Sequence, residues 1–158
     1  MQLNAMVTMV VLGSPVLAIS QSAHLPTTSP AVKLNEIPTN IGSPFQLHEE
    51  LAEKIHSGNN SDVYKFENAQ VGKIDQCILI YETVQDTIDS ITLLLTDEKS
   101  REQARQQADK QFGTARFGQN EMMSVYGWMH ETRERKVSIS LAFASREPTS
   151  EMFIKKME

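Results

Sequence analysis

The chain has 158 residues, of which 40% are hydrophobic and 22% are charged, and its formal net charge is −5 at pH 7. This composition is that of an ordinary soluble domain and excludes collagen-like, coiled-coil and disulfide-scaffold proteins. A mildly acidic chain is also a poor nucleic-acid binder, because neutralising phosphates requires clustered Lys and Arg side chains.

The first 32 residues contain no Asp, Glu, Lys or Arg. Residues 5–12 are apolar apart from Thr8, and Gly13, Ser14 and Pro15 follow them. A short apolar core, a break and small residues are typical of a secretory signal peptide. A membrane-spanning helix would need about 20 uninterrupted apolar residues. We therefore predict a signal peptide over residues 1–20.

This interpretation of the N-terminus has one weakness and one alternative. Signal peptides begin with a positively charged region, whereas no Lys or Arg precedes residues 5–12. The alternative is an apolar N-terminus that is disordered or packs in the core. On the signal-peptide reading, cleavage falls between Ala18 and Ala23, the protein is exported to a periplasmic or extracellular location, and its mature form has no stable membrane insertion.

Residues 21–42 form the next segment. They contain Pro26, Pro30 and Pro38 among many Ser, Thr and Asn residues and show no hydrophobic periodicity. Such a composition favours an extended leader. We expect the remaining residues, 43–158, to form a single domain.

A helix signal opens this domain. Ser43 is suited to the N-cap, Pro44 to the first helical position, and Gln46 completes a capping box. Apolar residues then recur every four positions, and Gly58 follows. The pattern predicts a helix over residues 44–57.

Three strands are predicted next, over residues 63–67, 72–84 and 88–96. The last of them is ambiguous, since apolar residues over 84–95 fit a helical period as well as an alternating one. Dense β-branching favours the strand. Cys77 lies in the second strand, and we interpret this only cysteine as a small buried hydrophobe.

A second helix is predicted with Thr96 or Asp97 as its N-cap and Gln111 or Phe112 as its last residue, followed by a helix stop and turn over 113–118. Two alternating runs, 121–132 and 136–145, predict an antiparallel hairpin, and residues 149–158 can add a short element. The order α-β-β-β-α-β-β indicates an α+β fold, with an antiparallel sheet of about five strands and one or two helices packed on it.

The candidate binding residues lie on the last hairpin. A period of two places Tyr126, Trp128 and His130 on one face of the strand, and the partner run carries small residues at alternate positions. We expect the aromatic side chains to lie over this floor of small residues. Either a helix packs on the face, with Trp128 in the core, or the face is an exposed patch for a ligand or protein partner.

The sequence shows no assembled catalytic, metal or cofactor motif, so we predict no catalytic residues, no metal and no cofactor. The leading hypothesis is a small exported non-enzymatic domain that binds a protein or a cell-envelope component and no nucleic acid. The alternative is a secreted hydrolase that uses His130 and a carboxylate from Glu131, Asp86 or Asp89. The oligomeric state stays open.

Overall fold

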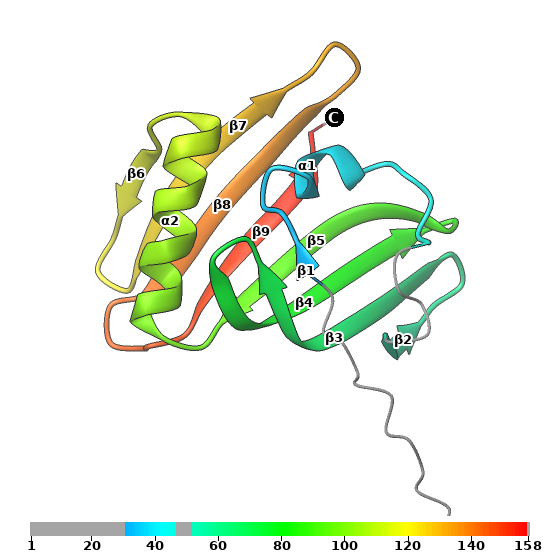
Figure 1. Cartoon of the computed structure of the whole chain (residues 1–158), viewed down its shortest axis with the longest axis horizontal. Coiled ribbons are helices and arrows are strands. Elements are labelled where there is room, and N and C mark those ends of the chain that lie inside the picture. The colour runs from blue at the N-terminus through cyan, green and yellow to red at the C-terminus, as the bar shows by residue number, and fades with distance from the viewer. Residues whose placement is uncertain (1–30, 47–51, 158) are drawn as a thin grey trace, which may run out of the picture.

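The structure, a computed structural model, describes residues 31–46 and 52–157 and is drawn in Figure 1. The strands of this part of the chain are β1 (Ala31–Val32), β2 (Glu53–Ser57), β3 (Ser61–Val71), β4 (Ile74–Val84), β5 (Thr87–Leu95), β6 (Arg116–Gln119), β7 (Met123–Glu131), β8 (Lys136–Ala144) and β9 (Ser150–Lys156). Its helices are α1 (Ile37–Asn40) and α2 (Glu98–Phe112).

All nine of these strands join one sheet in the order β1-β3-β4-β5-β9-β8-β7-β6, and β2 also pairs with β3. The sheet consists of two antiparallel meanders, β3-β4-β5 and β6-β7-β8-β9, with α2 as the connection between them. The meanders join where β5 pairs with β9. Only β1 is parallel to its neighbour, β3, so the sheet is mixed.

The prediction of an α+β fold with about five strands was therefore wrong, because the protein is mostly β. The predicted strands and hairpin correspond to β3, β4, β5, β7 and β8. The four other strands lie in segments interpreted as a leader (β1), a helix (β2), a turn (β6) and a short additional element (β9). Each of these four is seven residues or shorter and depends on pairing with a longer strand for its conformation.

The helix predicted over residues 44–57 is contradicted at both ends that the structure describes; residues 47–51 lie outside the described part. Gly42 and Phe45 donate backbone hydrogen bonds to Ile88 O and Asp86 O, so this segment is extended beside the start of β5. Residues 53–57 form β2 and pair with β3. Ile55 is 48% exposed, so it does not belong to a packed apolar stripe.

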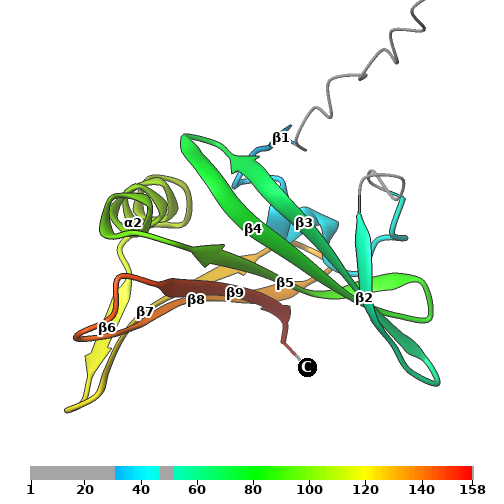
Figure 2. The same cartoon turned by 90° about the horizontal axis from the view of Figure 1, so that it is seen from below.

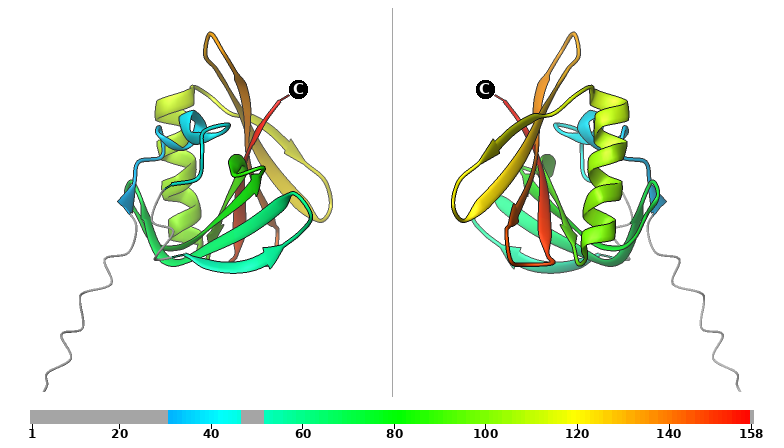
Figure 3. Two further views of the ribbon diagram at one scale, coloured as in Figure 1. Left: turned by 90° about the vertical axis from the view of Figure 1, so that its right-hand side faces the viewer. Right: turned by 90° about the vertical axis from the view of Figure 1, so that its left-hand side faces the viewer.

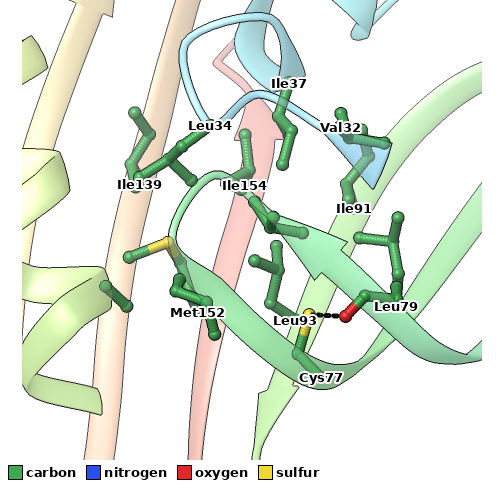
Figure 4. Close-up of a cluster of buried hydrophobic side chains, with 14 of the residues drawn as sticks. Val32, Leu34, Ile37, Cys77, Leu79, Ile91, Leu93, Ile139, Met152 and Ile154 are labelled. Carbon is green, nitrogen blue, oxygen red and sulfur yellow. Dashed lines mark hydrogen bonds between the residues drawn. The ribbon is translucent and has the colours of Figure 1, made fainter. Parts of the chain in front are cut away.

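The predicted leader over 21–42 differs from the structure in its described part, residues 31–42. Leu34, Ile37 and Ile41 are fully buried there. Leu34 and Ile37 lie over Ile139 and Ile154 of the sheet, as the close-up of the core shows (Figure 4), and Ile41 belongs to the same buried cluster. The Arg135 guanidinium donates a hydrogen bond to Ile41 O, and this contact ties the segment to the β7-β8 turn. Residues 31–42 thus complete the core.

The sheet is strongly bent, and both helices lie on its concave side (Figures 2 and 3). Side chains facing this side alternate along each strand with side chains facing outward. The concave rows are fully buried across the central strands, as for Leu79, Leu93, Met152 and Leu141. Cys77 is buried in the same layer, its thiol donates to Ala69 O at 3.3 Å, and burial raises its pKa to about 11. The interpretation of Cys77 as a small core residue is confirmed.

Helix α2 agrees with the prediction. The Asp97 side chain caps it by accepting a hydrogen bond from Ser100 N at 2.7 Å, and Gly113 ends it with a φ of +89°. Ala104 and Ala108 are fully buried against the sheet. Because these side chains are small, the helix axis can approach the strands closely.

The tight β3-β4 turn requires a glycine. Gly72 has a φ of +61°, and a Cβ atom added there would stand 2.1 Å from Gln107 Oε1. We expect Gly72→Ala to lower the free energy of unfolding by about 1–3 kcal/mol, because the substitution strains the backbone and displaces Gln107. Urea denaturation would measure this loss. Gly118→Ala is the control: its Cβ meets nothing within 4 Å, so a change below about 0.5 kcal/mol is expected. Equal losses in both variants would contradict the prediction.

Candidate functional site

Two of the three candidate residues pack beneath α2. Trp128 is 6% exposed, and its Nε1 donates to Asp109 Oδ1 at 3.0 Å. Tyr126 is half-buried beside it, with a ring-centroid separation of 6.3 Å. Of the two readings of this face, the structure therefore shows the one in which a helix covers it and Trp128 belongs to the core.

The expected floor of small residues lies on the opposite face. The β7-β8 register places Tyr126 opposite Leu141, Trp128 opposite Ile139 and His130 opposite Val137. In an antiparallel pair, directly opposed residues point to the same side of the sheet. The aromatic residues therefore share the concave side with bulky aliphatic residues, and the small residues of β8 face outward.

The third candidate, His130, lies near the end of β7. Its ring meets that of Phe112 edge-on at a centroid distance of 5.5 Å. The neighbouring carboxylate of Glu131 forms an ion pair with Lys136 at 3.2 Å. Asp89 lies on β5, three strands away in the sheet, which corresponds to about 14 Å at the usual strand spacing. Neither Asp89 nor Asp86, in the turn before β5, is brought to His130.

The burial of Trp128 gives a simple spectroscopic prediction. Trp128 is the only tryptophan of the chain, so it alone determines the tryptophan emission. We expect blue-shifted emission that resists acrylamide quenching in the folded protein, because α2 shields the indole from solvent. Unfolding in urea should shift the emission to the red and restore quenching. Emission in native buffer that already resembles the unfolded protein would contradict this placement.

Beyond the edge of α2, an aromatic row continues across the concave side. Tyr126 lies 4.8 Å from Phe117 and 6.1 Å from Phe143, measured between ring centroids. The guanidinium groups of Arg101 and Arg105 lie over the rings of Phe143 and Tyr126, at 4.2 and 5.6 Å. These residues border a groove of about 570 Å³. Both aromatic rings that line this groove, Tyr126 and Phe143, thus have an arginine side chain of the same chain over them.

Apart from Lys99, the charged side chains that line this groove are paired with one another. Arg105 donates to both carboxylate oxygens of Glu102, at 2.6 and 2.9 Å, and to Asp109 Oδ2 at 2.9 Å. The hydrogen bonds from Arg105 hold the pKa of Glu102 at about 2, far below its usual range. The arrangement resembles a structural network more than a vacant binding site.

A different surface, the outer face of the sheet, is the stronger candidate. In cross-strand order, one of its rows is Ile78, Leu94, Glu151, Ala142 and Val125. The adjacent row is Ile80, Thr92, Phe153, Ser140 and Gly127. Both rows are only partly buried or exposed. Neither α1 nor α2 covers this side (Figure 2).

The outer face is hollowed at one end. We call this hollow, of about 590 Å³, the outer groove; its lining includes Ile78, Leu94, Met123, Ala142, Glu147 and Glu151. Met123 is 42% exposed, and Met129 and Phe153 stand elsewhere on the same face at 51% and 38% exposure. The sequence showed the alternation that creates this face. Along β7, this alternation places Met123, Val125 and Met129 on the face opposite to Tyr126 and Trp128.

Comparison with known proteins gives this chain no relative: no protein family, curated protein or solved structure matches it. Neither helix in the described ranges is long and apolar enough to cross a membrane. Within the same ranges, no three His, Cys, Asp or Glu side chains gather in a way that would hold a metal ion.

Proposed function

We propose that this protein is a small exported domain, without enzymatic activity, that binds another protein through the outer groove. The observation that carries the proposal is an uncovered sheet face on which apolar side chains predominate, with Thr92, Ser140 and Glu151 as the polar members of its two rows. An antiparallel sheet with one side in water usually presents polar residues there. A contiguous exposed apolar patch instead marks an interaction site in a soluble domain.

The shape of the outer face supports a protein partner. On the outer face, Ser140 and Ala142 of β8 and Gly127 of β7 form a strip of small residues. The longer side chains of Phe153 and Met123 stand on either side of it. Small residues allow a partner's backbone to approach closely, and methionine side chains adapt to different apolar surfaces.

The charges at the groove define the chemistry of the partner. Glu147 and Glu151 both line the groove and are exposed, and neither forms an ion pair with the residues that the structure describes. A segment that carries apolar side chains for the groove and a Lys or Arg at its end would complement both features. We therefore propose an apolar, basic-flanked protein segment as the partner.

Two synthetic peptides of equal apolar content, one flanked by Lys and the other by Glu, would test this choice. We expect the Lys-flanked peptide alone to shift the amide resonances of β7, β8 and β9 in NMR spectra. Ala142→Arg should abolish the shifts, since it fills the groove and adds a like charge. Asn59→Arg adds the same charge in an exposed turn elsewhere and should leave binding intact. Equal binding of both peptides, or unchanged binding by Ala142→Arg, would overturn the proposal.

The export part of the proposal rests on residues 1–20, which lie outside the described part of the structure. N-terminal sequencing of the protein from its native source would test it. A mature N-terminus between Ile19 and His24 is the expected result, while an intact Met1 would contradict export by cleavage of a signal peptide.

A further inference from the structure

A polar pocket lies between α2 and the β3-β4 turn, on the helix-covered side of the sheet and away from the outer groove. Its volume is about 400 Å³, within the range of small-molecule sites. Its lining is uniform in character and consists of Lys73, Gln103, Gln106, Gln107, Lys110 and Gln111.

One wall of this pocket is fixed by the fold. Lys73 N donates to Gln107 Oε1 at 3.1 Å, and Gln107 Nε2 donates to Gln103 O at 3.3 Å. Gly72 N donates to Val32 O at 2.8 Å, which anchors the other side of the turn to β1. The backbone that carries Lys73 is therefore held against α2 before any ligand arrives. Preorganisation of this kind reduces the entropy lost on binding.

The pocket is positively charged although the chain as a whole is acidic. No carboxylate lines it, and neither Lys73 nor Lys110 forms an ion pair with a described residue. Among the other described lysines, five are paired with carboxylates, namely Lys33, Lys54, Lys65, Lys136 and Lys155, while Lys99 and Lys156 have no ion pair and do not line this pocket. The nearby Glu102, which accepts from Gln106 at 2.9 Å, is neutralised by Arg105. Two lysines beside one pocket thus remain available to an anion.

The glutamines determine what else the ligand must carry. Gln103 and Gln111 make no side-chain hydrogen bond with the described residues, and each amide can both donate and accept. Hydroxyl groups, which also donate and accept, match such a surface. We propose that this pocket binds a monosaccharide-sized acidic sugar, with its anionic group between Lys73 and Lys110 and its hydroxyl groups on the glutamine amides.

NMR titration of the full chain would test the pocket, with D-glucuronate and glucose 6-phosphate as the acidic sugars and glucose and acetate as controls. We expect at least one acidic sugar to shift the amide resonances of residue 73 and of α2, and the two arms distinguish a sugar carboxylate from a sugar phosphate. Glucose and acetate should each bind about tenfold more weakly or worse, because each supplies half of the contacts. Binding of neither acidic sugar would overturn the proposal, and so would acetate binding as tightly as glucuronate.

Variants make the test specific to this pocket. Lys73→Gln and Lys110→Gln should each weaken binding of the acidic sugar by about tenfold, since each removes one charge-assisted contact. Lys99→Gln removes an exposed charge from another position of α2 and should leave the affinity unchanged. Ala142→Arg, in the outer groove, should also leave it unchanged, so failure of this proposal and failure of the protein-binding proposal are distinguishable. Equal affinity in all four variants would contradict the assignment to this pocket.

Discussion

A chain that begins at Ser43 is expected to be unfolded at 25 °C. It lacks Leu34, Ile37 and Ile41, which are at most 1% exposed in the structure. Burying a side chain of this size contributes about 1.5–3 kcal/mol, so the three together account for about 5–9 kcal/mol. This loss is comparable with the whole stability of a typical domain, about 5–15 kcal/mol. The truncation also exposes the aliphatic layer beneath them.

Far-UV circular dichroism and a urea titration would measure the effect of the truncation. The matched control is a chain that begins at Ala31, which keeps β1, α1 and every buried residue described here. It should unfold cooperatively at the same urea concentration as the full chain. A cooperative transition of unchanged midpoint in the chain from Ser43 would show that residues 31–42 are the dispensable leader that the sequence suggested.

Trp128→Ala is expected to lower the free energy of unfolding by about 3–5 kcal/mol. The substitution leaves a cavity under α2 where the indole is 94% buried, and cavities of this kind have costs in that range. It also removes the N–H donor of the 3.0 Å hydrogen bond to Asp109. Urea denaturation followed by circular dichroism is the suitable measurement, because the variant has no tryptophan fluorescence.

Trp128→Phe separates the two contributions. Phenylalanine retains most of the apolar contact but no donor, while Asp109 keeps its bonds from Ala115 N at 3.1 Å and Arg105 Nη1 at 2.9 Å. We expect this variant to lose about 1–2 kcal/mol, as for a single hydrogen bond to a charged group together with a small packing defect. A loss below about 1 kcal/mol in Trp128→Ala would contradict the placement of this residue in the core.

Capping residues, β-branched residues and alternating apolar patterns correctly predicted α2, β5 and the β7-β8 hairpin. Helix α2 has its N-cap at Asp97 and its stop at Gly113, and it begins and ends within a residue of the predicted bounds. Strand β5 was ambiguous in periodicity, and its β-branched residues gave the correct answer. The hairpin of β7 and β8 was predicted from the alternating runs over residues 121–132 and 136–145.

Long-range pairing explains the elements that were missed. The capping signal at Ser43 is chemically sound, but Ser43 O instead accepts a hydrogen bond from Ile88 N at 2.9 Å. Strand β6 contains only four residues, including a glycine, so its alternation is too short to recognise.

The candidate site, too, was predicted only where local sequence signals determine it. Alternation correctly placed Tyr126, Trp128 and His130 on one side of β7. It did not indicate which side α2 would cover, because that depends on the crossover between β5 and β6. The pairing register between β7 and β8 could not be predicted either, and a shift of one residue in this register exchanges the two faces of a strand. The uncovered face therefore became visible only in three dimensions.

The position of β9 has a consequence for the order of folding. Residues 150–156 form the strand that joins the two meanders, and β5 meets them across more than 50 intervening residues. Until this strand is in place, β5 and β8 are both unpaired edges and the layer beneath α1 is incomplete. Sheets with such distant pairings fold slowly, because the entropy of closing a long loop is lost before the contacts form. During synthesis the sheet would therefore stay incomplete until β9 had emerged from the ribosome.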